Sequence, residues 1–283
     1  MSKAMQYREV VKIHLAQIAK EHGIVFIHVA DAGSRSWGSS TEDSDIDLKC
    51  IHVKLPWARN VEESTDTLRS TQTIRILGTA GDDVPVSIDL QSFELRKALQ
   101  LLTRSDPVFY DMVYSPGVMA QSEMMHSCVY PMVEAYQNRS LMARRYAEMA
   151  FNNLWPERSS RDPEVRDNPP TKRALMLALR FTMLCEAVMQ DKSYKVRDYQ
   201  GLIDLDLAAG YKRMWPEVMD YNDVEVHHHT AIMRDFLDFL TRRQKEFPLP
   251  GERNRDMHLC QRAYSAITKH VVLNYTESHL DWK

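Results

Sequence analysis

The segment from residue 24 to residue 53 constrains the fold more than any other part of the chain. It holds two short runs rich in β-branched and apolar residues, IVFIHVA at 24–30 and IDLKCIHV at 46–53, and both runs predict buried strands. Between them, the polar and glycine-containing stretch from Gly33 to Ser44 predicts a turn and a helix start. We therefore expect a strand–turn–strand unit with polar side chains where the second strand begins.

Strand and helix patterns alternate before residue 130, and helical patterns dominate after it. Further strands are expected at 73–77 and 84–93, followed by an amphipathic helix in ELRKALQLLTR and a short helix near Pro107. Helical periodicity then covers roughly 132–155, 171–190, 223–247 and 255–275. The expected fold class is therefore α+β, with an α+β domain in residues 1–130 and a helical domain in residues 131–283.

Composition excludes several classes of protein. The 283 residues carry 36 Lys and Arg and 39 Asp and Glu, a net charge of −3, and 44% are hydrophobic, so the chain can bury a core and is not disordered as a whole. No apolar run approaches the roughly 18 residues of a membrane helix, and the N-terminus lacks the apolar stretch of a signal peptide. The near-neutral charge argues against a protein that coats nucleic acid, although it permits a local basic groove. Four widely spaced cysteines predict thiols rather than disulfides or a zinc site, so we expect a cytoplasmic protein.

Three aspartates are candidate metal ligands. Asp45 and Asp47 are two residues apart at the start of the second expected strand, where side chains at i and i+2 point to one face about 6.6 Å apart. Two carboxylates so close repel each other unless a cation lies between them. Asp89, on the later strand of VSIDL, is a candidate third ligand, and three hard oxygen ligands suit Mg²⁺ or Mn²⁺ better than zinc. For an isolated pair of this kind, a solvated or capping role is the alternative.

The turn after the first expected strand is a candidate phosphate site. Gly33 and Ser34 follow that strand and precede a turn or helix, which offers backbone N–H groups, a hydroxyl and the Arg35 side chain to a phosphate. A plain structural turn is the alternative for a Gly-Ser pair.

Taken together, these motifs resemble a known family. GSRSWG followed by DSDIDLK is similar to the signature of the predicted nucleotidyltransferases of the DNA polymerase beta superfamily, a bacterial and phage family with RNA-repair-associated members. The block at 92–116 and the helical segments at 143–150 and 171–181 resemble the same family, so the resemblance covers roughly residues 24–210. One departure is Asp31-Ala32, where the family more often has Glu-Ser.

The resemblance implies a fold and a set of roles. The fold would be a small mixed sheet with flanking helices, followed by a helical C-terminal domain. Asp45, Asp47 and Asp89 would hold two Mg²⁺ or Mn²⁺ ions as the catalytic residues. Gly33, Ser34 and Arg35 would bind the nucleotide's phosphates. Lys172 and Arg180, eight residues apart on one expected helix, could also approach the nucleotide, with an exposed helix face as the alternative.

The expected function follows from these roles. It is a metal-dependent transfer of a nucleoside monophosphate from an NTP to an acceptor hydroxyl with release of pyrophosphate, the acceptor being an RNA end, tRNA-like, in repair or modification. The RNA acceptor rests on the resemblance alone. Candidate residues for a basic groove are Arg144, Arg145, Arg158, Arg161, Lys172 and Arg173. The alternatives are transfer to a protein or small molecule, and a catalytically idle nucleotide- or RNA-binding protein.

Overall fold

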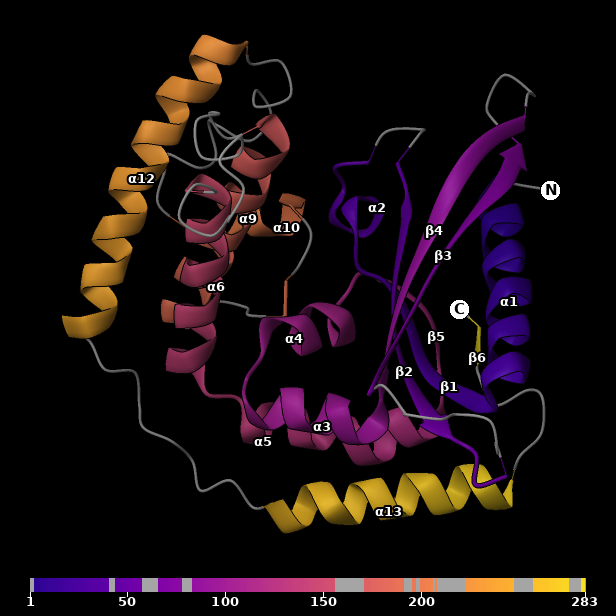
Figure 1. Ribbon diagram of the computed structural model, residues 1–283. Coiled ribbons are helices and arrows are strands. Elements are labelled where there is room, and N and C mark those ends of the chain that lie inside the picture. Colours follow the sequence, from indigo (N-terminus) through magenta and orange to yellow (C-terminus); the bar gives the residue numbers. More distant parts are fainter. Residues whose placement is uncertain are drawn as a thin grey trace. The chain divides into compact units, whose positions relative to one another are not determined.

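The protein divides into two compact units, a sheet unit and a helical unit (Figure 1). The computed structural model describes residues 3–40, 44–57, 66–77, 83–155, 171–190, 195–196, 199–205, 207, 222–246, 257–274 and 281–282. The sheet unit comprises Met1–Arg104, Val108–Gln137 and Asn254–Lys283, and the helical unit comprises Ser105–Pro107 and Asn138–Arg253. Residues 254–283, which the sequence analysis assigned to the helical domain, therefore cluster with the sheet.

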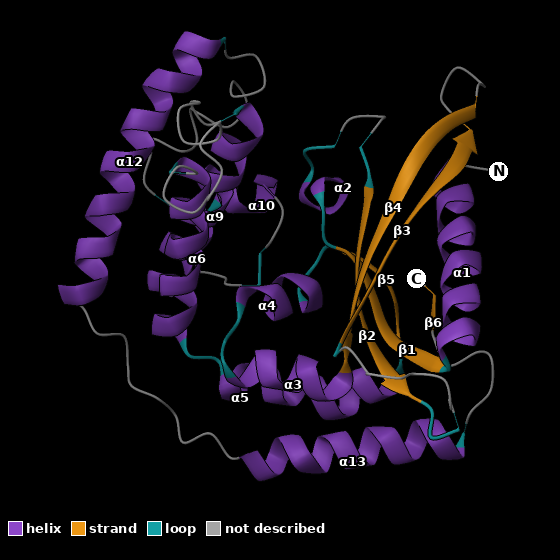
Figure 2. Ribbon diagram, in the orientation of Figure 1, coloured by secondary structure: helices purple, strands orange, loops and turns teal. Residues whose placement is uncertain are grey.

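A mixed sheet forms the centre of the sheet unit (Figure 2). Its strands, in the order β3-β4-β2-β1-β5-β6, are Thr67–Leu77, Asp83–Glu94, Ile46–Lys54, Ile24–Asp31, Gly117–Gln121 and Asp281–Trp282. β2 and β4 pair in parallel, and the other neighbours pair antiparallel. The expected strands and the mixed sheet are confirmed. β3 is longer than its expected segment at 73–77, and β5 and β6 were not expected.

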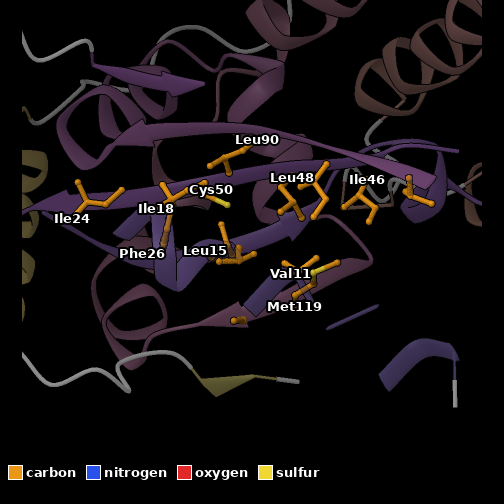
Figure 3. Packing of buried hydrophobic residues seen from close by; sticks show 14 residues of the cluster. Val11, Leu15, Ile18, Ile24, Phe26, Ile46, Leu48, Cys50, Leu90 and Met119 are labelled. Carbon is orange, nitrogen blue, oxygen red and sulfur yellow. The ribbon is translucent and has the colours of Figure 1, made fainter. Parts of the chain in front are cut away.

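One face of the sheet is apolar and is covered by α1 (Lys3–His22). Because successive side chains of a strand point to opposite faces, Ile46, Leu48 and Cys50 of β2 all point into this core, as do Ile88 and Leu90 of β4. Figure 3 shows the three β2 side chains and Leu90 near apolar side chains of α1. Asp47 and Lys49 of β2 and Asp89 of β4, which lie between these core residues, face the other side and are polar, so the alternation of this part of the sequence separates core from candidate site.

Helices complete the sheet unit. They are α2 (Ser34–Trp37), α3 (Leu95–Thr103), α4 (Pro107–Val113), the π-helix η1 (Met125–Val129), α5 (Tyr130–Tyr136) and α13 (Met257–Leu273). The expected helix after β4 is confirmed as α3, and the Glu94 carboxylate caps it by accepting a hydrogen bond from the Arg96 N–H at 2.7 Å. α13 packs against α3 and η1, which explains why the end of the chain joins the sheet.

The helical unit is built from α6 (Arg139–Leu154), α9 (Lys172–Met189), α10 (Tyr199–Asp204) and α12 (Asp223–Glu246). The helix expected over 132–155 is two helices, because Asn138 adopts extended backbone and its side chain caps α6 by accepting from the Leu141 N–H at 2.9 Å. α6 and α9 pack together, with the rings of Tyr146 and Phe181 stacked at 6.4 Å. Among the residues described, no helix is both long enough and apolar enough to span a membrane.

Candidate active site

Two of the three candidate carboxylates lie side by side on neighbouring strands. The parallel register of β2 and β4 pairs Asp47 directly with Asp89. Neighbouring strands lie about 4.8 Å apart, so both carboxylates rise from the polar face within reach of one ion. Both are half-buried, and both line a cavity of about 370 Å³. The other residues that line the cavity are Leu48, Lys49, Arg69, Ser70, Thr71, Leu90 and Gln91.

Gly33 lies directly against Asp47. The end of β1 is held beside the start of β2 by a hydrogen bond from the Ala32 N–H to the Asp47 carbonyl oxygen at 2.9 Å. A Cβ atom on Gly33 would lie 2.0 Å from Oδ2 and 2.5 Å from Cβ of Asp47. Only glycine therefore permits the carboxylate and the turn to approach each other this closely. Ser34, half-buried, then begins the short helix α2.

The Asp31 side chain anchors the Gly33–Ser34 turn through hydrogen bonds, a role that the sequence did not predict. Its Oδ1 accepts a hydrogen bond from the Gly33 N–H at 3.0 Å, and its Oδ2 accepts one from the Tyr7 hydroxyl at 2.8 Å. The Ser115 hydroxyl donates to the main-chain oxygen of Asp31. The Gly33 N–H, expected to face a phosphate, is thus engaged by Asp31. Burial raises the pKa of Asp31, and burial together with the neighbouring Asp31 raises the pKa of Tyr7.

Arg35 and Asp45 lie at the entrance to β2. Arg35 Nε donates to the main-chain oxygens of Ser44 at 3.0 Å and Asp45 at 3.3 Å, so the guanidinium fastens the segment that leads into β2. This contact supports a positioning role for Arg35, beside the phosphate role expected from the sequence. The Asp45 side chain is exposed and precedes the first residue of β2.

The donor set suits a hard divalent ion. Within the described ranges, no group of three or more His, Cys, Asp or Glu side chains is placed to share an ion, so Asp45 does not join Asp47 and Asp89. Mg²⁺ is usually held by one or two carboxylates together with water and substrate phosphates. The Asp47–Asp89 pair meets that requirement, and Asp45, two residues before Asp47, is the nearest further carboxylate along the chain.

The remaining expected nucleotide-binding residues lie in the helical unit. Lys172 is exposed in the first turn of α9, whereas Arg180 is fully buried, with its guanidinium carbon 5.7 Å from the centre of the Phe181 ring. Burial of Arg180 favours a structural role within the helices. Arg144, Arg145 and Arg173 are exposed, and Arg158 and Arg161 lie outside the described residues.

Comparison with known proteins identifies the family. Residues 7–211 match the RNA repair pathway DNA polymerase beta family. The chain belongs to this family. The resemblance seen in the sequence is therefore confirmed, and it begins earlier than residue 24, at Tyr7 within α1. Members of this RNA repair pathway family are nucleotidyltransferase-like, which agrees with the carboxylate pair and the glycine turn.

Two individual proteins are also similar. The uncharacterized protein YcgL of Bacillus subtilis is 29% identical over 94 residues, which are 33% of this chain and 32% of YcgL. The chain thus matches about a third of the length of that relative. A nucleotidyltransferase-like protein from Exiguobacterium sibiricum 255-15 aligns over 95% of this chain and 92% of its own, with 9% identity and a TM-score of 0.31.

Proposed function

We propose that this protein is a metal-dependent nucleotidyltransferase that moves a nucleoside monophosphate from an NTP to a hydroxyl at the end of an RNA. The observation that carries the proposal is the pairing of Asp47 with Asp89 on parallel strands, with Gly33 against the Asp47 carboxylate. Membership of the RNA repair pathway DNA polymerase beta family supports the same reaction type. The RNA acceptor is drawn from the family's name and from the sequence resemblance.

Each residue then has a defined task. Asp47 and Asp89 would hold Mg²⁺ or Mn²⁺, in two sites as expected from the sequence. Asp45, which is exposed and stands apart from the pair in this structure, would become a further ligand by turning towards the ions. The bound ions would supply charge stabilisation at the α-phosphate and a more acidic acceptor hydroxyl. The acceptor oxygen bonds to the α-phosphorus while the bond to the pyrophosphate oxygen breaks, and Asp89 can take the acceptor's proton. The Ser34 hydroxyl would hold the departing phosphates, and Lys172 is a further candidate for these contacts.

The decisive experiment measures which molecule receives the label from each α-labelled NTP. The protein is incubated with Mg²⁺ or Mn²⁺ and with small RNA, protein extract or no acceptor. Label on RNA is the expected result. Label on protein would assign the same chemistry to a different acceptor, and metal-dependent NTP binding without transfer would indicate an idle nucleotide-binding protein. Either of these results would overturn the proposed function.

Carboxylate variants test the site itself. We expect three variants to abolish transfer: Asp47→Asn, Asp89→Asn and Asp45→Ala. Each substitution removes one negative charge from the ion site, and the two Asn substitutions hardly change the volume of the side chain. Glu9→Gln is the matched control, since Glu9 is exposed on α1, the helix that covers the opposite face of the sheet. Circular dichroism checks that each variant folds. Full residual activity of Asp47→Asn would remove the basis of the assignment.

A further inference from the structure

Two rows of polar side chains cross three neighbouring strands on the face of the sheet opposite α1. The registers of β2 with β4 and of β4 with β3 define both rows. The first row holds the two carboxylates and a hydroxyl: Asp47, Asp89 and Thr71. The second row, two residues further along β2, holds two cations and an amide: Lys49, Gln91 and Arg69.

Both rows face the same cavity. All six residues line the space of about 370 Å³, and rows two residues apart are separated by about 6.6 Å. Arg69 is exposed, and Lys49 and Gln91 are half-buried, so solvent reaches all three residues of the second row. The two positive formal charges equal the two negative ones, and the cavity therefore presents a cationic row beside an anionic row.

The two flanks of the carboxylate pair differ. The Gly33–Ser34 turn lies beside Asp47 at the start of β2, whereas the cationic row lies two residues further along β2, on the other side of the carboxylate row. If the turn side receives the phosphates that leave, the cationic row is placed for the other reactant. This step rests on the proposed function, because it takes the carboxylate pair as the place where the new bond forms.

We propose that Lys49, Gln91 and Arg69 bind the phosphodiester on the 5′ side of the acceptor's terminal nucleotide, and that the acceptor is therefore the 3′ end of an RNA strand. A terminal 3′ hydroxyl and the 5′ phosphate of the same nucleotide are joined through one ribose, so they can occupy neighbouring rows. The Arg69 guanidinium can bind a phosphate through two parallel hydrogen bonds, and Lys49 adds a point charge. The Gln91 amide donates as a neutral group. A protein hydroxyl acceptor carries no phosphate for this row.

Binding experiments test the row separately from catalysis. A 5′-labelled single-stranded RNA octamer with a 3′ hydroxyl is titrated by fluorescence anisotropy with Mg²⁺ and no NTP, at several salt concentrations. We expect Arg69→Ala to weaken binding about tenfold and to lower the salt slope by about 1, as loss of one phosphate contact does. Arg69→Lys should be intermediate. Lys12→Ala is the matched control, because Lys12 is exposed on α1, over the opposite face.

Transfer assays with minimal acceptors give the second readout. Wild-type protein should prefer the dinucleotide UpU to uridine as acceptor, and Arg69→Ala should lose that preference while its KM for NTP is unchanged. If wild-type protein labels RNA and Arg69→Ala keeps its affinity, salt slope and preference, the row is not an RNA site and the proposed function stands. If Arg69→Ala instead raises the KM for NTP, the row holds the triphosphate and the inference is wrong. If no transfer occurs but Arg69→Ala weakens RNA binding as stated, the row is supported and the proposed function fails.

Discussion

At the scale of single residues, the contact between Gly33 and Asp47 is the most restrictive feature of the site. Gly33→Ala would place a Cβ atom 2.0 Å from Asp47 Oδ2, so the carboxylate or the turn must move. A displacement of about 1 Å in such a site can lower the rate of reaction about 10²-fold. We expect Gly33→Ala to lose transfer activity by at least this factor and to weaken Mn²⁺ binding, measured by label transfer and by titration calorimetry.

A second glycine of the same turn provides the control for this prediction. Gly38 has φ of 81° and nothing within 4 Å of an added Cβ, so Gly38→Asn, which tolerates left-handed backbone, should retain activity. Equal loss in both variants would show that the turn is merely intolerant of side chains. Wild-type activity in Gly33→Ala would contradict the packing of Gly33 on Asp47.

Asp31 supports a prediction about pH. Burial raises its pKa above the ordinary value of 3.8, so the folded protein favours the protonated carboxyl. Asp31 therefore contributes stability that is fully present below its ordinary pKa and is lost as the pH rises through the raised one. Asp31→Asn keeps an oxygen for the Gly33 N–H and removes this titration. In urea titrations we expect the unfolding free energy of wild type, relative to Asp31→Asn, to fall as the pH rises above the ordinary pKa of 3.8; a constant difference would contradict the prediction.

The sequence was enough to predict which residues form the site, but only some of the contacts that those residues make. Asp47 and Asp89 stand out because aspartate is unusual inside an otherwise apolar strand. Asp31 was not assigned a function, because a strand-end aspartate gives no sign that a tyrosine 24 positions earlier will donate to it. Arg69 lay in a polar stretch, and its place beside the carboxylates depends on the register of β3, which residue identity alone does not specify.

At the scale of elements, the parallel pair β2 and β4 contains a buried His52–Ser92 hydrogen bond, at 2.8 Å between Nδ1 and Oγ. Burial, with smaller effects of Lys54 and His22, lowers the pKa of His52 to about 3. A depressed histidine pKa stabilises the fold above its ordinary pKa of 6.5, and this stability is lost as the pH falls towards 3. The loss approaches about 1.4 kcal/mol per pH unit.

The substitution His52→Asn tests this pair, because the asparagine amide can still contact Ser92 while it does not titrate. We expect wild type to lose stability relative to His52→Asn between pH 6.5 and pH 4.5, with a slope that steepens towards about 1.4 kcal/mol per unit. Hydrogen exchange of β2 and β4 peptides at each pH measures the difference. If the stability of the two proteins changed with pH in the same way, the fold would not hold His52 in its neutral form.

The success of element prediction followed the strength of local patterns. The apolar strands β1, β2 and β4 and the amphipathic helix α3 were predicted within about two residues, because burial imposes a clear period on each. Most of β3 was missed, since its described side chains from Thr67 to Thr73 are half-buried or exposed and an edge strand needs few apolar residues. β5 and β6 are short, and their pairing comes from distant parts of the chain.

At the scale of the whole molecule, the division into units depends on where α13 packs. Its helical period was visible in the sequence, but a period does not say which core a helix covers. α13 packs on α3 and η1 of the sheet unit, although more than a hundred residues of the helical unit precede it. The helical unit is therefore inserted, along the chain, between segments that belong to the sheet unit.

Because α13 packs in the sheet unit, a cavity made in α13 should destabilise the sheet unit and not the helical unit. Ile267 of α13 and Leu179 of α9 are both fully buried, and truncating either to alanine should cost about 2–5 kcal/mol. Ile267→Ala should raise hydrogen exchange in α3 and in the strands of the sheet while α6 and α9 keep their protection. Leu179→Ala should do the reverse. Mass-spectrometric hydrogen exchange on both variants checks this, and increased exchange of α6 and α9 in Ile267→Ala, with the sheet protected, would assign α13 to the helical unit instead.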